Sequence, residues 1–128
     1  MEQAVDFRKA LRAYGFMRVG IGLAFLVAPR WFLGKWIGPT AATPAGLFLG
    51  RMFGARDAVL GAGTVAAART GSGMRTWAMV GAAADASDAV LSLSAMGRLP
   101  KRGLALAAAS ASLGVASGLG VARGLRSS

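Results

Sequence analysis

The chain has 128 residues, enough for one domain, and 55% of them are hydrophobic while 16% are charged, with a mean hydropathy of +0.52. A water-soluble domain of this size needs more polar surface, so the composition favours a membrane protein. The absence of Cys excludes disulfides and thiolate chemistry, and the absence of His removes the commonest metal ligand and general base.

Four apolar stretches follow one another, each close to the roughly 20 residues that a helix needs to cross a bilayer. We expect transmembrane helices at about 10–28, 44–69, 74–96 and 102–123. A helix satisfies its own backbone hydrogen bonds in lipid, and the alternating pattern of a barrel is not seen in the sequence. The sequence therefore predicts an all-α, integral membrane four-helix bundle with short loops, formed by residues 1–128 as a single domain.

The first helix follows a basic region, as the apolar segment of a cleaved signal peptide also does. However, Arg18 interrupts its apolar run, and Pro29 directly follows Ala28, where the cleaved bond would fall. We therefore expect the segment to be kept as a membrane helix, with residues 4–13 continuing it along or into the membrane interface.

The next segment, 29–38, combines two Trp with two cations, a composition that settles at the level of the lipid headgroups. We expect it to lie flat on the membrane, anchored by Trp31, Lys35 and Trp36. Thr43 and Pro44 then form a good N-cap and first turn for the second helix. Residues 71–73, Gly-Ser-Gly, predict a tight turn that makes the second and third helices antiparallel neighbours.

Small residues recur at every fourth position of the last helix, at Ser110, Gly114, Gly118 and Ala122. Such a stripe lets helix backbones approach closely in lipid. It fits tight packing inside the bundle, and it also fits an interface with another membrane protein subunit. The second interpretation is favoured for this helix because its apolar stretch contains no charge to shelter and few large side chains.

The formal net charge of +10 raises the question of a nucleic-acid partner. The cations come in twos and threes at every membrane boundary, whereas a nucleic-acid binder gathers them into one stripe with aromatic residues. Anionic lipids are therefore the expected partners of these cations, and we expect no nucleic acid.

The loop cations also bear on topology. If both termini are cytoplasmic, that side holds seven cations, Arg8, Lys9, Arg12, Arg69, Arg75, Arg123 and Arg126, against five on the other side, Arg30, Lys35, Arg98, Lys101 and Arg102. This bias predicts a multi-pass membrane protein with both termini cytoplasmic.

Six charged residues lie inside the apolar stretches: Arg18, Arg51, Arg56, Asp57, Asp85 and Asp88. An ionised side chain in hydrocarbon costs several kcal/mol, so it is expected to be paired, hydrated or functional. At about 1.5 Å per residue, Arg18, Arg56, Asp57 and Asp88 reach nearly the same depth, with Arg51 shallower and Asp85 deeper. We predict an intramembrane polar cluster in which Arg56 pairs with Asp88 or Asp85.

This cluster fits a salt-bridge network that fixes which helices are neighbours, and it also fits a polar cavity that binds a headgroup, an ion or protons. Asp85-x-x-Asp88 has some likeness to the carboxylate pairs that hold Mg²⁺ and a diphosphate in lipid-modifying enzymes. Those enzymes use more acidic ligands than this chain contains. We therefore expect no catalytic residue, no metal and no cofactor.

The segment Arg18-Val19-Gly20-Ile21-Gly22 leading to Pro29, the run from Gly50 to Asp57, and Asp85 with Asp88 resemble small bacterial four-helix membrane proteins of unknown function, distantly like the DoxX-type proteins. The resemblance covers about residues 10–96. It implies a four-helix, multi-pass protein of the bacterial cytoplasmic (inner) membrane without assigned chemistry.

Three functions remain open. The first, and favoured, is a non-enzymatic accessory subunit of a larger membrane assembly such as a transporter or a cell-envelope lipid system. The second is a small transporter or binder of a lipid or hydrophobic solute that uses the Arg and Asp cluster. The third is a metal-dependent enzyme that acts on a lipid phosphate through Asp85 and Asp88.

Overall fold

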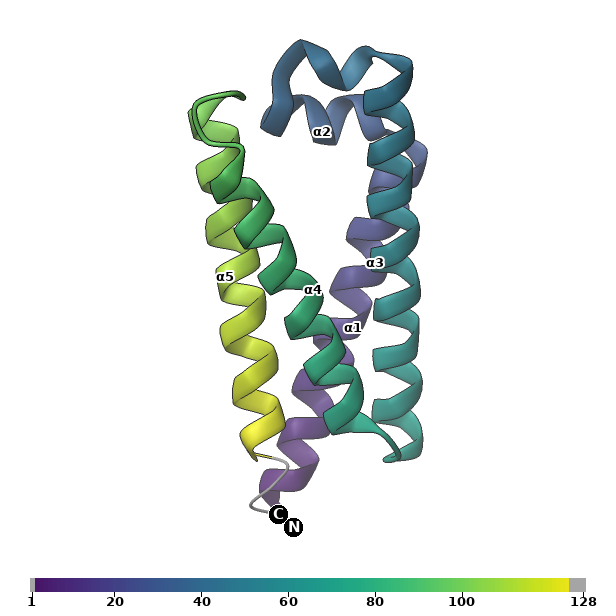
Figure 1. Cartoon of the computed structure of the whole chain (residues 1–128). Coiled ribbons are helices and arrows are strands. Elements are labelled where there is room, and N and C mark those ends of the chain that lie inside the picture. Colours follow the sequence, from purple (N-terminus) through teal and green to yellow (C-terminus); the bar gives the residue numbers. More distant parts are fainter. Residues whose placement is uncertain (1, 125–128) are drawn as a thin grey trace.

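The computed structural model describes residues 2–124, with side chains described from Asp6 onward, and its elements are helices (Figure 1). In chain order these are α1 (Glu2–Val27), α2 (Pro29–Ile37), the 3-10 helix η1 (Gly38–Ala42), α3 (Pro44–Thr70), α4 (Met74–Ser94) and α5 (Lys101–Gly124). The prediction of an all-α fold is confirmed. Arg126, counted among the loop cations, lies outside the described residues.

The helix boundaries follow from local sequence. The Thr43 hydroxyl accepts a hydrogen bond from the Gly46 backbone N–H at 3.1 Å, which caps α3 just before Pro44. At the other end of α3, Gly71 and Gly73 have φ angles of 76° and 71°, a left-handed conformation that glycine adopts without strain. Two glycines this close together reverse the chain between α3 and α4.

The first helix begins at Glu2, well before the start predicted near residue 10. It therefore includes the stretch 4–13 that was expected to continue this helix, and Leu11 in this stretch is 1% exposed and packs in a cluster with Ala68, Ala78 and Ala122. The amphipathic N-terminal stretch is therefore held against the bundle as a continuation of the helix.

The long helices form two close pairs, α1 with α3 and α4 with α5. In the first pair, a Cβ atom added at Gly61 would lie 2.6 Å from the Gly15 carbonyl oxygen, and one added at Gly54 would lie 2.6 Å from the Gly22 carbonyl oxygen. Only glycine permits this backbone approach. In Figure 1 the two pairs meet at the end where α3 turns into α4 and separate toward the end covered by α2.

Side chains larger than alanine gather at the two ends of the interior. One apolar cluster surrounds Leu11 near the α3–α4 turn. The other contains Phe25, Leu33 and Ala41, with Phe53 and other aromatic rings packed on it, beneath α2. Between these clusters the buried residues are mostly glycine and alanine, together with Thr64, Val65 and a group of charged side chains.

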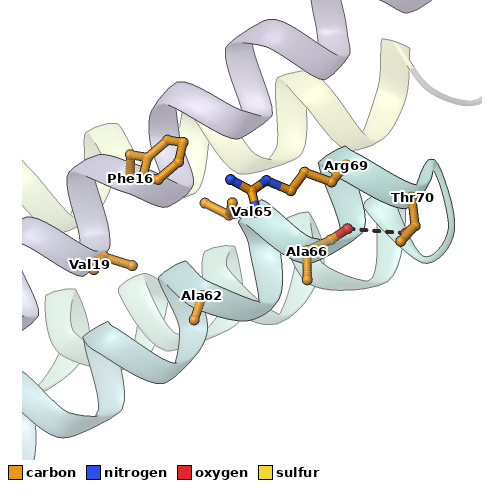
Figure 2. A pocket seen from close by; sticks show the side chains of 7 residues that line it. All are labelled: Phe16, Val19, Ala62, Val65, Ala66, Arg69 and Thr70. Carbon is orange, nitrogen blue, oxygen red and sulfur yellow. Dashed lines mark hydrogen bonds between the residues drawn. The ribbon is translucent and has the colours of Figure 1, made fainter.

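A shallow groove follows the outer surface between α1 and α3. We call it the Arg69 groove; it is lined by Phe16, Val19, Ala62, Val65, Ala66, Arg69 and Thr70 (Figure 2). The groove exists because the side chains of Ala62 and Ala66 are small. Phe16, which is 49% exposed, forms one of its walls.

Two of the four long helices are long and apolar enough to cross a membrane, by length and composition: Asp6–Val27, within α1, and Lys101–Gly124. Within the chain, 28% of the apolar part of the first and 17% of the second is buried, so most of their apolar surface faces outward. The other two long helices carry Arg56 and Asp57 in α3 and Asp85 and Asp88 in α4, which lower their apolar character.

Candidate functional site

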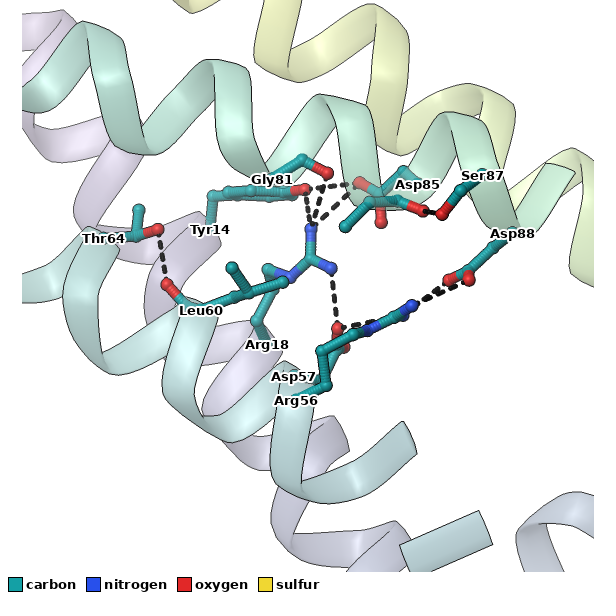
Figure 3. A network of polar contacts seen from close by, with 11 residues as sticks. Tyr14, Arg18, Arg56, Asp57, Leu60, Thr64, Gly81, Asp85, Ser87 and Asp88 are labelled. Atoms are coloured by element: carbon teal, nitrogen blue, oxygen red, sulfur yellow. Dashed lines mark hydrogen bonds and ion pairs between the residues drawn. The ribbon is translucent and has the colours of Figure 1, made fainter. Parts of the chain in front are cut away.

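Arg18 of α1 lies at the centre of the charged group and is 3% exposed. Its Nη2 donates to Asp57 Oδ1 of α3 at 2.6 Å, and its Nη1 donates to Asp85 Oδ2 of α4 at 3.0 Å (Figure 3). One guanidinium therefore bridges three helices and joins the two helix pairs. Ion pairing of this kind offsets part of the cost of burying the three charges.

Tyr14, one turn before Arg18, completes this centre. Its hydroxyl accepts from Arg18 Nη1 at 2.7 Å and donates to Asp85 Oδ2 at 2.8 Å. Arg18, Tyr14 and Asp85 thus form a closed triangle of hydrogen bonds. Tyr14 was not among the predicted site residues, although its spacing of four residues from Arg18 puts the two side chains on one helix face and is a signal present in the sequence.

Arg56 and Asp88 form a second pair, from α3 to α4. Arg56 Nη1 donates to Asp88 Oδ1 at 2.8 Å and Nη2 donates to Asp88 Oδ2 at 2.6 Å, a bidentate arrangement. Of the two partners predicted for Arg56, the structure pairs it with Asp88. Arg56 Nη2 also lies 3.8 Å from Asp57 Oδ1, which links this pair to the Arg18 centre.

The two parts of the network differ in burial. The side chains of Arg18 and Asp57 are 4% and 6% exposed, whereas those of Arg56 and Asp88 are 35% and 24% exposed. The second pair therefore lies at the open side of the network, where the helix pairs begin to diverge.

Arg51 does not join the network. It lies on the exposed surface of α3 and makes no hydrogen bond or ion pair with the residues that the structure describes. The apolar stretches of the sequence contain three cations and three anions. The network itself contains two cations, Arg18 and Arg56, and three carboxylates.

Gly114 of α5 makes room for the Asp85 carboxylate. A Cβ atom added at Gly114 would collide with Asp85 Oδ2 and lie 2.7 Å from its Cγ. The last helix, which carries no charge of the network, therefore covers one side of it with bare backbone.

The predicted small-residue stripe on this helix is largely turned inward. A Cβ atom added at Gly118 would lie 2.9 Å from the Ala78 carbonyl oxygen and from Ala82 Cβ, and Ala122 is buried in the Leu11 cluster. Ser110 is exposed. Three of the four stripe residues thus contact other helices of the chain, as the packing interpretation expects.

The three predicted membrane anchors differ in their exposure. Trp31 is 62% exposed, and Lys35 Nζ lies 3.9 Å from the centre of its ring. Trp36 is half-buried, with ring centroids 5.1 Å from Phe25 and 5.8 Å from Phe53. Trp31 and Lys35 are therefore available at the surface, whereas Trp36 belongs to the aromatic cluster beneath α2.

The carboxylates of Asp85 and Asp88 are each held by a different arginine, Arg18 and Arg56. A pair of carboxylates that binds Mg²⁺ instead directs its oxygens to the metal and substrate phosphates. Among the described residues there is also no group of three or more acidic side chains placed to hold a metal ion. The arrangement fits a salt-bridge network better than it fits the lipid-phosphate site.

Comparison of the chain with models of known families, with curated proteins and with solved structures gave no significant match. The resemblance to DoxX-type proteins therefore stays a prediction from the residues named above.

Proposed function

We propose that this chain is a small polytopic membrane protein whose four long helices all cross the bilayer. One observation carries the proposal: the charged side chains of Arg18, Asp57 and Asp85 are buried, while large apolar side chains are exposed on every long helix. Examples with at least half of their surface exposed are Met17, Leu23, Val59, Val90, Leu91, Leu106 and Leu113. Water favours the opposite distribution, and lipid favours this one.

The network explains how α3 and α4 would be tolerated in lipid. They have 27 and 21 residues, sufficient for the roughly 20 residues of a span, but each carries charges that are expensive in hydrocarbon. Arg18 pairs with Asp57 and Asp85, and Arg56 pairs with Asp88, which offsets most of these charges within the bundle. In this arrangement α2 lies at the headgroup level, where the exposed Trp31 and Lys35 bind the interface.

We further propose that the protein acts as a non-enzymatic accessory subunit of a larger assembly in a bacterial cytoplasmic membrane. The network directs its charges at one another, which leaves the outer surface as the place for interaction. Arg51 lies on that surface, between the exposed Phe48 and Met52, about 10 Å along α3 from Pro44. An arginine among lipid-facing apolar side chains is stabilised by a carboxylate of a neighbouring helix.

Purification of the tagged protein from native membranes in mild detergent tests this role. We expect a stoichiometric membrane partner with the wild type, and its loss with Arg51→Gln. Arg98→Gln is the matched control, because Arg98 is an exposed cation in the loop between α4 and α5. Elution of the wild type without a stoichiometric protein partner would contradict the subunit proposal.

A second function, binding of a lipid or hydrophobic solute with a polar group, is favoured by the open side of the network. Arg56 Nε is buried without a hydrogen-bond partner among the described residues, although its side chain is 35% exposed. A solute oxygen that enters between the helix pairs would find this donor. Co-purification of a small molecule that is lost with Arg56→Lys, which lacks Nε–H, would support this function over the first.

A further inference from the structure

The Arg69 groove has a long apolar floor and a cationic end. Val65, Val19 and the alanines of α3 form the floor, and Arg69 closes the end near the α3–α4 turn. From Ala62 to Thr70 the groove follows about 12 Å of α3, given the rise of 1.5 Å per residue. Half of a bilayer's hydrocarbon core is about 15 Å thick, so the groove matches most of one leaflet.

The Arg69 side chain lies over the groove in Figure 2, with its guanidinium directed toward Val65 and Phe16. It makes no hydrogen bond or ion pair with the part of the chain that the structure describes. Its five donors are therefore available to a ligand that occupies the groove.

Arg12 supplies a second cation at the same level. Its guanidinium carbon lies 5.9 Å from the centre of the Phe16 ring, which is one wall of the groove. The antiparallel register, in which Gly15 lies against Val65 and Gly71 against Arg8, puts Arg12 beside the last turns of α3. Arg69 therefore lines the groove, and Arg12 lies over the Phe16 ring that forms one of its walls.

We propose that this groove binds an anionic phospholipid, with one acyl chain along Val19, Ala62 and Ala66 and the phosphate between Arg69 and Arg12. The complementary charge selects the occupant: guanidinium groups bind phosphate oxygens through paired hydrogen bonds, and a zwitterionic lipid offsets the phosphate charge with its own cation. Further exposed cations at this end, Arg8, Lys9 and Arg75, raise the local concentration of anionic lipid without forming the groove. The proposal rests on the membrane location proposed above.

Native mass spectrometry of the detergent-purified protein, titrated with phosphatidylglycerol or with phosphatidylcholine of the same chains, tests the site. We expect one phosphatidylglycerol to bind more tightly than phosphatidylcholine. The Arg12→Gln/Arg69→Gln variant should weaken phosphatidylglycerol binding about tenfold and leave phosphatidylcholine nearly unchanged.

Two further variants separate the groove from general surface charge. Ala66→Leu fills the groove without altering any charge and should weaken binding of both lipids. Arg75→Gln, which removes an exposed cation of α4 outside the groove, should retain the wild-type affinity. Equal losses with Arg75→Gln and Arg69→Gln, or unchanged binding with Ala66→Leu, would overturn the proposal.

If the proposed membrane location is wrong, a different experiment shows it. In that case the protein leaves the membrane fraction on alkaline washing. If it stays in that fraction with unchanged helical content while the lipid titrations show no selectivity, the lipid site alone is wrong.

Discussion

Arg18 Nη2 and Asp57 Oδ1 lie 2.6 Å apart and join α1 to α3 in a part of the interior where most of the packed residues are glycine and alanine. Both side chains are almost fully buried. This bond lies between the two apolar clusters at the ends of the bundle, where it adds an electrostatic contact to the close packing of the two helices.

Arg18→Leu should therefore be among the most destabilising single changes. It leaves Asp57 and Asp85 buried without their counter-charge, and removal of one partner of a buried pair typically costs about 3–5 kcal/mol. Unfolding in detergent, followed by circular dichroism, measures the effect. Arg18→Leu/Asp57→Asn should recover part of the loss, whereas a double variant with the sum of the single losses would speak against the pairing.

The Arg56–Asp88 pair should contribute less, because it is partly exposed. We expect Arg56→Ala and Asp88→Ala each to lower stability, and the double variant to lose less than the sum. Arg51→Ala is the control on the same helix and should change the free energy of unfolding by no more than about 0.5 kcal/mol. If Arg51→Ala lowered the stability as much as Arg56→Ala does, the loss would come from removing a positive charge from α3 and not from breaking the Arg56–Asp88 pair.

Gly114→Ala should destabilise the protein because the added methyl group collides with the Asp85 carboxylate. Overpacking of this kind typically costs about 1–3 kcal/mol. Gly120→Ala is the matched control on α5: nothing lies within 4 Å of its added Cβ, and alanine favours a helix by up to about 1 kcal/mol. Equal thermal stability of the two variants would show that α5 does not cover the network at this position.

Gly22→Ala tests the packing of α1 against α3 in the same way. Its Cβ would lie 2.6 Å from the Gly54 carbonyl oxygen and 2.9 Å from Ala58 Cα, and backbone atoms cannot move aside as a side chain can. We expect a loss of unfolding free energy for Gly22→Ala and none for Gly20→Ala, whose Cβ meets open space. If both variants lost stability, the loss would come from replacing a glycine in α1 and not from the contact of Gly22 with α3.

The membrane topology is accessible to cysteine labelling because the native chain has no Cys. Ser72 and Thr40 are exposed and lie at opposite ends of α3. In intact cells an impermeant thiol reagent should label Thr40→Cys and leave Ser72→Cys unlabelled, as cytoplasmic termini require. Labelling of Ser72→Cys alone would reverse the orientation, and labelling of both from outside would contradict a single spanning α3.

The depth of the charges could be predicted from the sequence because the helical rise per residue is fixed. Arg56 and Asp88 are about equally far from the same end of the bundle on their helices, and the structure brings them together. Depth alone does not distinguish Arg51, which at 3.6 residues per turn points roughly 120–140° away from Arg56 and Asp57 around the helix axis. The same periodicity directs Trp36 away from Trp31.

Other features depend on tertiary contacts that no local pattern contains. Gly114 faces Asp85 because α5 lies along α4, and α5 has no charge by which that face could be identified beforehand. The small-residue stripe predicts close approach of a helix correctly. It does not say whether that helix belongs to the same chain.

The separation into helix pairs has a consequence for biosynthesis. Within the network, the pair α1–α3 contributes Arg18, Arg56 and Asp57 and carries one excess positive charge, while α4 contributes Asp85 and Asp88 and carries two negative charges. Translation delivers the positive pair first. In the proposed membrane location, the later helix hairpin would enter the bilayer beside two arginines that are already in position, so the order of synthesis would supply Asp85 and Asp88 with counter-charges as they arrive.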